Sequence, residues 1–354
     1  MEYSTHAAIL DFMEQAPSPA SALLETLRLS RGLTQVELAR ATGIAQATLS
    51  KVESGVMDLD ADRWEKIAAA LRVPVRAFTE ASITVHPERI FHRKRRTTPK
   101  SEIRRIGADL ALTRQRIARL IGAPATTLQR HDLEDGFVTP QEIAQAVRSD
   151  LGAGTEPITD LTGLLENAGV TVLCWALDSL QVDAIAAWPE DAAPLILLRE
   201  DASAERQRFT MAHELGHAVL HDGEATEQQE READAFGAEF LLPAARLRRE
   251  WPTPPHLEDL LPLKRRWGVS LSALIRRAHD CDLLDESAYR HWNIVLSTSG
   301  MHRREPDPLP PERPRLVTDN IHAELAKGAT LEKLAERTHM STDEFSSIFL
   351  EKSA

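Results

Sequence analysis

The feature that most constrains this chain is the string HELGH at residues 213–217, which lies in a run, 206–221, that is compatible with a helix apart from one glycine. On a helix, His213 and His217 lie one turn apart and point in the same direction. Two imidazoles at this spacing can bind one Zn²⁺, and Glu214 between them is placed to take a proton from a water that the metal activates. The string therefore predicts a helix that carries two zinc ligands and a general base.

A catalytic zinc site also needs a third protein ligand and an open fourth position. The segment Glu230–Pro243 follows a short polar loop and has the apolar periodicity of a second helix. Glu230 and Asp234 are four residues apart and therefore lie on one face of that helix. Glu230 can complete the zinc site, and Asp234 can accept the free ring N–H of a ligand histidine. Glu232 is the rival third ligand, although it points about 160° away from Glu230 around the helix axis.

Residues 204–243 resemble the ImmA/IrrE family of metallopeptidases, in which HELGH is followed by the pattern E-x-x-A-[DN]-x-F-x-A-x-x-L-x-P. Both parts are present here, and Gly237 stands where the family commonly has Ala, at a position that we expect to touch no ligand. The family includes peptidases that cleave a repressor and relieve repression, in mobile-element control and in stress response. The resemblance thus implies a gluzincin-like zinc endopeptidase that acts on a regulatory protein.

Three strand-like runs precede the HExxH segment, at Val170–Leu177, Val182–Trp188 and Leu195–Arg199. A small sheet ahead of the HExxH helix is the zincin arrangement, and an edge strand of such a sheet can pair with an extended substrate. The same residues would equally suit a sheet that only covers the helix, and the sequence does not separate the two.

A zinc peptidase needs a donor for the oxyanion of its tetrahedral intermediate. The candidates are His279, Tyr289 and His291, each of which is also explained as a structural or surface residue. We expect His221 to belong to the packing or to a loop, because three better-placed ligands exist.

The N-terminal part, residues 20–80, is expected to form a run of short helices. Thr34 is a good N-cap for a helix at Gln35–Thr42, and Glu37 completes a capping box. Gly43 then permits a tight turn before the next helix, which ends at Ser54. The apolar residues have the spacing that packs two helices across a short turn, which is typical of a helix-turn-helix.

The strings LTQVELA at 33–39 and QATLSKVESG at 46–55 resemble the XRE/Cro/C1-type repressor domain. The resemblance implies a five-helix bundle, with DNA contacts from Gln35, Gln46, Ala47, Thr48, Ser50 and Lys51. Gln46 and Thr48 are suited to base edges. Gln35, Ser50 and Lys51 are suited to phosphates. Ala45 stands where the family usually has a Ser or Thr cap, a loss of about 1 kcal/mol of helix stability. A bundle used only for protein contacts is the alternative.

The composition limits the partners and the compartment. A chain of 354 residues is long enough for two or three domains, and its formal net charge of −12 excludes nonspecific binding of nucleic acid by the whole molecule. Any contact with operator DNA must therefore use a local basic face. The two cysteines, Cys174 and Cys281, form no disulfide framework, and no signal peptide or apolar span is apparent. We expect a soluble, cytoplasmic protein with no membrane partner.

Three further segments have open interpretations. The basic run His92–Arg96, which continues to Arg105, is equally typical of a solvated face and of a segment that follows the phosphate backbone. Residues 297–315 are rich in proline and predict a linker or extended arm. Residues 330–341 repeat the pattern of residues 34–45, but Asp343 and Glu344 would repel phosphate, so we expect a helical hairpin for protein contact. Its apolar side chains need cover from the body of the protein or from a second subunit, so a homodimer is possible.

We therefore predict an α+β, mainly α fold: an XRE/Cro-C1-like bundle, a zincin-like metallopeptidase domain and a C-terminal helical tail. The predicted domains are a DNA-binding domain at 1–82, a basic linker and helical connector at 83–155, a peptidase domain at 156–296, and a Pro-rich linker with a hairpin at 297–354. The predicted function is that of a DNA-binding transcriptional regulator with a zinc endopeptidase domain, whose partners are operator DNA and a repressor or operon neighbour. The alternative is a non-proteolytic repressor or a toxin–antitoxin antitoxin, in which the zinc domain is a sensor or scaffold.

Overall fold

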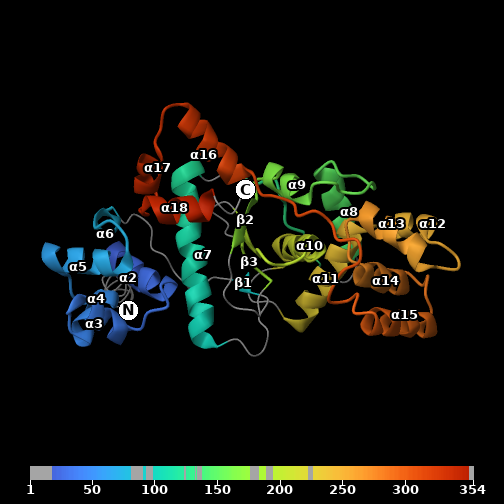
Figure 1. The fold of residues 1–354 in the computed structure, drawn as a ribbon, viewed down its shortest axis with the longest axis horizontal. Helices are drawn as coiled ribbons and strands as arrows, with labels where there is room; N and C mark the ends of the chain where they lie inside the picture. Colours follow the sequence, from blue (N-terminus) through green and yellow to red (C-terminus); the bar gives the residue numbers. More distant parts are fainter. Residues whose placement is uncertain are drawn as a thin grey trace, which may run out of the picture. The chain divides into compact units, whose positions relative to one another are not determined.

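The computed structural model of the protein describes residues 18–80, 91–92, 99–122, 125–131, 133, 138–175, 183–188, 194–221 and 226–350. The chain divides into two compact units, which are treated separately below (Figure 1). The first comprises residues 1–90, 94–123 and 317–354, and the second comprises residues 91–93 and 124–316. Within the described ranges, no helix combines the length and the apolar character that crossing a membrane requires.

From residue 18, where the described part of the first unit starts, five short helices follow one another up to residue 80, as predicted: α2 (Pro19–Ser30), α3 (Gln35–Thr42), α4 (Gln46–Glu53), α5 (Ala61–Leu71) and α6 (Arg76–Thr79). Thr34 and Glu37 form the capping box at the start of α3, and Gly43 ends this helix with a φ of 70°, a conformation that glycine adopts without strain. The core of the bundle includes Leu38 of α3 and Leu49 of α4, both fully buried. This apolar seam holds α3 and α4 across their short turn.

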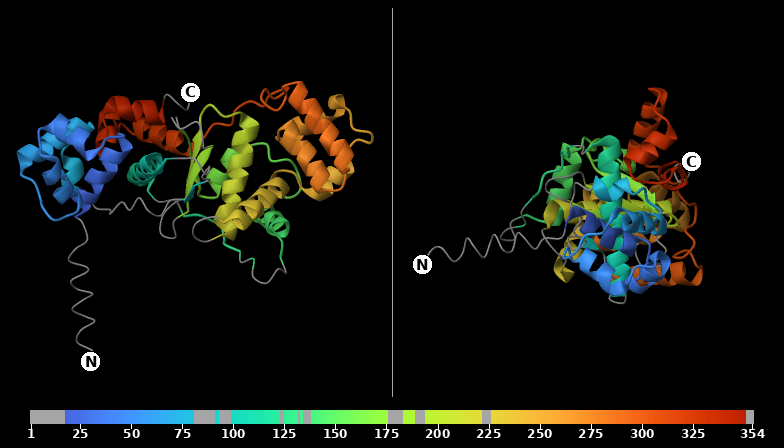
Figure 2. Two further views of the ribbon diagram at one scale, coloured as in Figure 1. Left: turned by 90° about the horizontal axis from the view of Figure 1, so that it is seen from below. Right: turned by 90° about the vertical axis from the view of Figure 1, so that its left-hand side faces the viewer.

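The long helix α7 (Lys100–Ile121) packs along α2, and the C-terminal helices α16 (Leu316–Ala326), α17 (Leu331–Arg337) and α18 (Thr342–Phe349) complete this unit (Figure 2). Glu344 of α18 accepts hydrogen bonds from Arg31 at 2.9 Å and from Arg116 of α7 at 3.4 Å. Although burial raises its pKa, the hydrogen bonds and charges of these two guanidinium groups outweigh burial and lower the pKa of the Glu344 carboxyl. The protein contact expected of the C-terminal hairpin is thus made within the same chain.

The four predicted domain segments stay a prediction, and the two compact units group parts of these segments differently. The connector predicted at 83–155 is divided, because α7 packs on the bundle whereas α8 (Pro140–Asp150) packs on a helix of the second unit. The segment predicted at 297–354 is divided too, at residue 316.

The second unit contains a four-stranded sheet in the order β1-β3-β4-β2. Its strands are β1 (Phe91–His92), β2 (Thr171–Trp175), β3 (Ala184–Ala187) and β4 (Leu195–Arg199), of which the last three lie within the predicted runs. β2 is parallel to β4, and β3 is antiparallel to β4. β1 pairs antiparallel with β3, on the side of β3 away from β4. His92, the first residue of the predicted basic run, therefore lies in an edge strand of the sheet. The rest of that run, 93–96, lies outside the described residues.

In the second unit, α8 and α9 (Leu161–Asn167) come before β2 in the chain. The helices that come after β4 are α10 (Ala204–Leu220), α11 (Glu227–Leu241), α12 (Ala244–Glu250), α13 (Leu257–Trp267), α14 (Leu271–Asp280) and α15 (Glu286–Thr298). Helix α10 packs against β4 on one side and against α11 on another. Its apolar residues Met211 and Leu215 enter one core with Phe236 and Phe240 of α11. The predicted fold class is confirmed: a mainly helical α+β chain in which a small sheet adjoins the helix of residues 213–217.

The Pro-rich arm, residues 299–315, is fixed to the second unit. Lys264 is fully buried in α13; its ammonium lies 3.0 Å from a carboxylate oxygen of Glu205 and 3.2 Å from one of Glu305. The same ammonium donates to the carbonyls of Pro306 and Asp307, at 3.1 and 3.0 Å. Because Glu205 belongs to the first turn of α10, this buried cation ties the arm to the start of the helix that carries HELGH.

Replacing Lys264 by Met is expected to destabilise the protein by about 3–5 kcal/mol, because it removes one partner of a buried ion pair and leaves the carboxylates without their cation. Thermal or denaturant unfolding measures the loss. The matched control is Arg290→Met, since the Arg290 side chain is 72% exposed beside Glu286, and exposed pairs contribute about 0–1 kcal/mol. Equal stability of the two variants would show that Lys264 does not hold the arm.

Candidate metal centre and DNA-binding helix

Helices α10 and α11 approach closely because each presents a glycine to the other. A Cβ on Gly216 would lie 3.1 Å from a ring carbon of Phe236, and a Cβ on Gly237 would lie 3.2 Å from the backbone nitrogen of His213. The expectation that position 237 touches no ligand residue was therefore wrong, since Gly237 packs on the backbone of His213. The close approach brings one face of α10 next to the first turns of α11.

Three side-chain donors converge between these helices. His213 Nε2 lies 3.0 Å from His217 Nε2, and the two nitrogens lie 3.5 and 3.4 Å from the carboxylate oxygens of Glu230. A tetrahedral zinc with bonds of about 2.0–2.1 Å places its ligands about 3.3 Å apart. The three separations are close to that length, so the donor set fits a zinc ion. Among the described residues, no other group of His, Cys, Asp and Glu comes together in this way.

The electrostatics of the cluster favour a cation. Hydrogen bonds with His213 and then His217 hold the pKa of the Glu230 carboxyl far below its usual range, although burial opposes them. An ionised carboxylate therefore faces two imidazole nitrogens. His213 is buried, with 1% of its surface exposed, and Glu214 beside it is 4% exposed. These donors can bind Zn²⁺, and the buried side of the site, around His213 and Glu214, strengthens the effect of its charge.

Both histidines have partners for their remaining ring nitrogens. His213 Nδ1 lies 2.7 Å from an Asp234 oxygen, the contact that the spacing on α11 predicts. His217 Nδ1 lies 3.0 Å from Nδ1 of His221, and Nε2 of His221 lies 3.0 Å from a Glu232 oxygen. Glu232, the rival third ligand, thus contacts His221. The sequence predicts a packing or loop position for His221 and does not indicate this contact, although the spacing of four residues between His217 and His221 is a usable signal.

The three candidates for an oxyanion donor have contacts of their own. The ring of His279 stacks on that of Tyr289 with centroids 4.3 Å apart, and its Nε2 lies 3.4 Å from Glu286. His291 lies edge-on to Trp292, with centroids 6.5 Å apart. These contacts are made within α14 and α15 and agree with structural roles. We assign the oxyanion donor to none of them.

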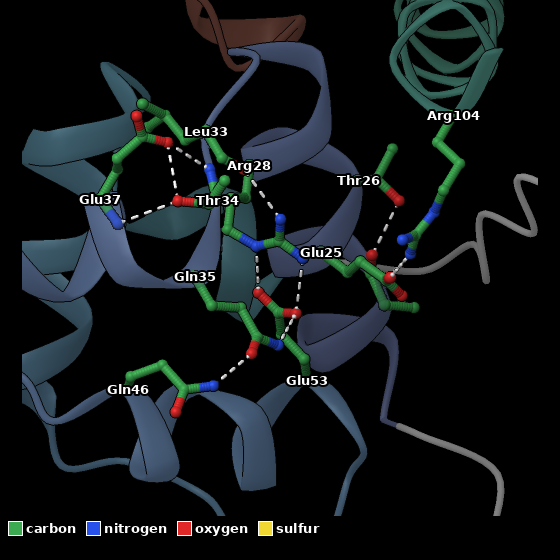
Figure 3. A network of polar contacts seen from close by, with 11 residues as sticks. Glu25, Thr26, Arg28, Leu33, Thr34, Gln35, Glu37, Gln46, Glu53 and Arg104 are labelled. Atoms are coloured by element: carbon green, nitrogen blue, oxygen red, sulfur yellow. Dashed lines mark hydrogen bonds and ion pairs between the residues drawn. The ribbon is translucent and has the colours of Figure 1, made fainter. Parts of the chain in front are cut away.

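In the first unit, a chain of hydrogen bonds links α4, the predicted recognition helix, to the core (Figure 3). Gln46 donates from Nε2 to Oε1 of Gln35 at 2.7 Å, and Gln35 donates to Glu53 at 2.8 Å. Glu53 also accepts two hydrogen bonds from the buried guanidinium of Arg28, at 2.6 and 2.8 Å. Because a bidentate pair fixes Glu53, the amides of Gln35 and Gln46 are held in defined orientations.

The remaining residues of the predicted DNA-contacting set lie on the same helix. Ala47 and Lys51 are exposed, and Thr48 and Ser50 are half-buried. Ala45 at the N-cap makes no side-chain capping hydrogen bond, as its apolar side chain requires. The role of Arg28 and Glu53 in fixing this face was not foreseen, because nothing in the sequence marks a pair 25 residues apart.

Comparison with known proteins agrees with this division of the chain. Residues 165–279 match the peptidase family described as the IrrE N-terminal-like domain, and residues 24–78 match the family described as helix-turn-helix. A search of curated proteins found no match. The first region contains the three donors, and the second contains the chain of hydrogen bonds at Gln46. The protein thus joins a helix-turn-helix domain to a metallopeptidase-like domain.

Proposed function

We propose that this fusion of a helix-turn-helix domain with an IrrE-like peptidase domain is a DNA-binding regulator that cleaves a repressor or another regulatory protein in a zinc-dependent reaction. The observation that carries the proposal is the convergence of His213, His217 and Glu230 on one point between α10 and α11. Three protein ligands that leave a fourth position open are typical of a catalytic zinc site rather than a structural one.

In the proposed reaction, His213, His217 and Glu230 would hold the zinc, which would supply Lewis-acid activation of water and of the substrate carbonyl. Glu214 would take a proton from the attacking water and pass it to the leaving amine. Its position next to His213 and its burial support this role, because a carboxylate that is shielded from bulk water transfers protons without competition from solvent. Asp234 would fix the ring of His213 through its Nδ1.

The test is to incubate the purified protein with the regulatory proteins encoded beside its own gene. Cleavage that stops with a chelator and returns with zinc would support the proposal. Binding of operator DNA without cleavage of any of them would favour the second candidate, a non-proteolytic repressor or antitoxin with the zinc domain as scaffold. The ordered face of Gln35 and Gln46 suits that candidate, whereas the buried Glu214 favours catalysis, because a scaffold needs no general base.

For the DNA-binding domain, Gln46→Ala is expected to lower the preference for operator over random DNA by about 1–3 kcal/mol, because it removes an amide that we expect to contact a base edge. Thr48→Ala should act in the same direction. Titrations of both DNAs by fluorescence anisotropy measure the ratio of the two affinities.

Lys51→Ala is the matched control on the same helix. It should weaken binding of both DNAs about equally, because Lys51 is expected to contact a phosphate of the DNA backbone. The slope of log affinity against log salt concentration should fall by about one. If Gln46→Ala and Thr48→Ala leave the specificity ratio unchanged, these residues do not read base edges.

A further inference from the structure

The metal ligand His217 has a partner that the proposed reaction does not use. His221, the residue after the end of α10, places its Nδ1 3.0 Å from Nδ1 of His217. Its other nitrogen lies 3.0 Å from Glu232 on α11, and Glu232 accepts a further hydrogen bond from Gln228 at 2.8 Å. The His221 side chain is 5% exposed and that of Glu232 is 20% exposed, so solvent competes little for the contact between them.

The main chain around His221 is also fixed. Its backbone nitrogen donates to the carbonyl of His217 at 3.1 Å, and its carbonyl accepts from Arg130. The preceding turn is held by a hydrogen bond from the His131 nitrogen to the carbonyl of Val219, at 2.7 Å. The ring of His221 is therefore placed by α10, by α11 and by residues 130–131, and it does not depend on the metal for its position.

Only one arrangement of protons satisfies these contacts when His217 binds a metal through Nε2. Its Nδ1 then carries a proton and must donate it, so Nδ1 of His221 must be the acceptor. The proton of His221 is then on Nε2, where it is donated to the Glu232 carboxylate. For His213, a carboxylate accepts the Nδ1 proton without an intervening histidine, because its Nδ1 lies 2.7 Å from Asp234.

We infer that His221 and Glu232 are positioning residues for the metal ligand His217: together they fix its ring orientation and keep its Nε2 free of a proton. This inference rests on the proposed zinc site. It adds two side chains to the set that the site requires: His221, directly after α10, and Glu232 on α11. Groups that orient a ligand histidine typically contribute about 10–100-fold to metal affinity.

The test compares two replacements of His221 that separate hydrogen bonding from packing. His221→Phe keeps a ring but removes the acceptor, and we expect it to weaken zinc binding by about 10–100-fold. His221→Asn is smaller but offers a carbonyl oxygen near the position of Nδ1, and it should recover most of the affinity. A purely structural role predicts the reverse order, because Asn fills less of the space of the histidine ring.

Zinc dissociation constants come from competition with a fluorescent chelator, for the full chain at fixed pH, with unfolding of the metal-free protein followed in parallel. Glu232→Ala is the second variant; it leaves the His221 ring in place and should lose about tenfold in affinity. His322→Phe, at an exposed position on α16, is the control and should bind as the wild type does.

Affinities for His221→Phe and Glu232→Ala within twofold of a wild type that binds one zinc would overturn the inference and leave the proposed function standing. So would a lower affinity for the Asn variant than for the Phe variant. A wild-type chain that binds no zinc would remove the proposed function, and this inference with it.

Discussion

Replacing Glu214 by Gln is expected to abolish peptide cleavage while the protein keeps its fold and its zinc. The amide has nearly the shape of the carboxylate but cannot accept the proton of the attacking water, and general base catalysis typically contributes about 10²–10⁴-fold to a rate. Glu214 is no member of the donor set, so the metal should remain. Cleavage rates and elemental analysis of the same preparations measure the two effects.

Glu258→Gln is the matched control for this variant, because Glu258 is an exposed glutamate on α13. It should cleave at the wild-type rate. Cleavage by Glu214→Gln at a rate close to that of the control would contradict the assignment of Glu214 as general base. Loss of zinc from Glu214→Gln would instead give this residue a part in holding the metal.

Replacing Glu230 by Gln is expected to remove the tightly bound zinc. The variant leaves two imidazoles and a neutral amide, which is a poor zinc ligand, and two good ligands are too few for tight retention. The loss of affinity should exceed the roughly 100-fold upper range for residues that only orient a ligand. Chelator competition gives the affinity, and elemental analysis after dialysis gives the retained metal.

Glu232→Gln is the matched comparison, since it changes the rival carboxylate on the same helix. It should retain most of its zinc, because Glu232 contacts His221 and not the three donors. The ligand assignment would be wrong if Glu230→Gln kept full zinc while Glu232→Gln lost it.

Much of the fold was predictable because local signals agreed with the final packing. The capping box at Thr34 and the glycine at position 43 mark the limits of α3, and β4 has the bounds that its apolar run predicts. Which distant segments of the chain pack together in one compact unit was not predictable. Nothing local shows that Glu344 pairs with Arg31, more than 300 residues earlier in the chain, or that Lys264 fixes the Pro-rich arm.

The candidate site was predictable where its chemistry follows helical periodicity. His213 and His217 share a face of α10, and Glu230 with Asp234 shares a face of α11, so the spacing alone indicated which side chains could converge. The contact between His217 and His221 was missed because His221 lies at the end of the helix, where periodicity stops predicting direction. The packing of Gly237 on His213 was missed because a helix crossing is a tertiary feature.

We propose above that this protein is a zinc-dependent peptidase that acts on a regulatory protein. The most direct test is mass spectrometry of each regulator encoded beside its gene, after incubation with the zinc-loaded protein, with the chelated protein and with Glu214→Gln. We expect defined fragments from one of these regulators with the zinc-loaded wild type only. If the folded, zinc-loaded wild type leaves every one of them intact, the claim of proteolysis is contradicted and the zinc domain is a sensor or scaffold.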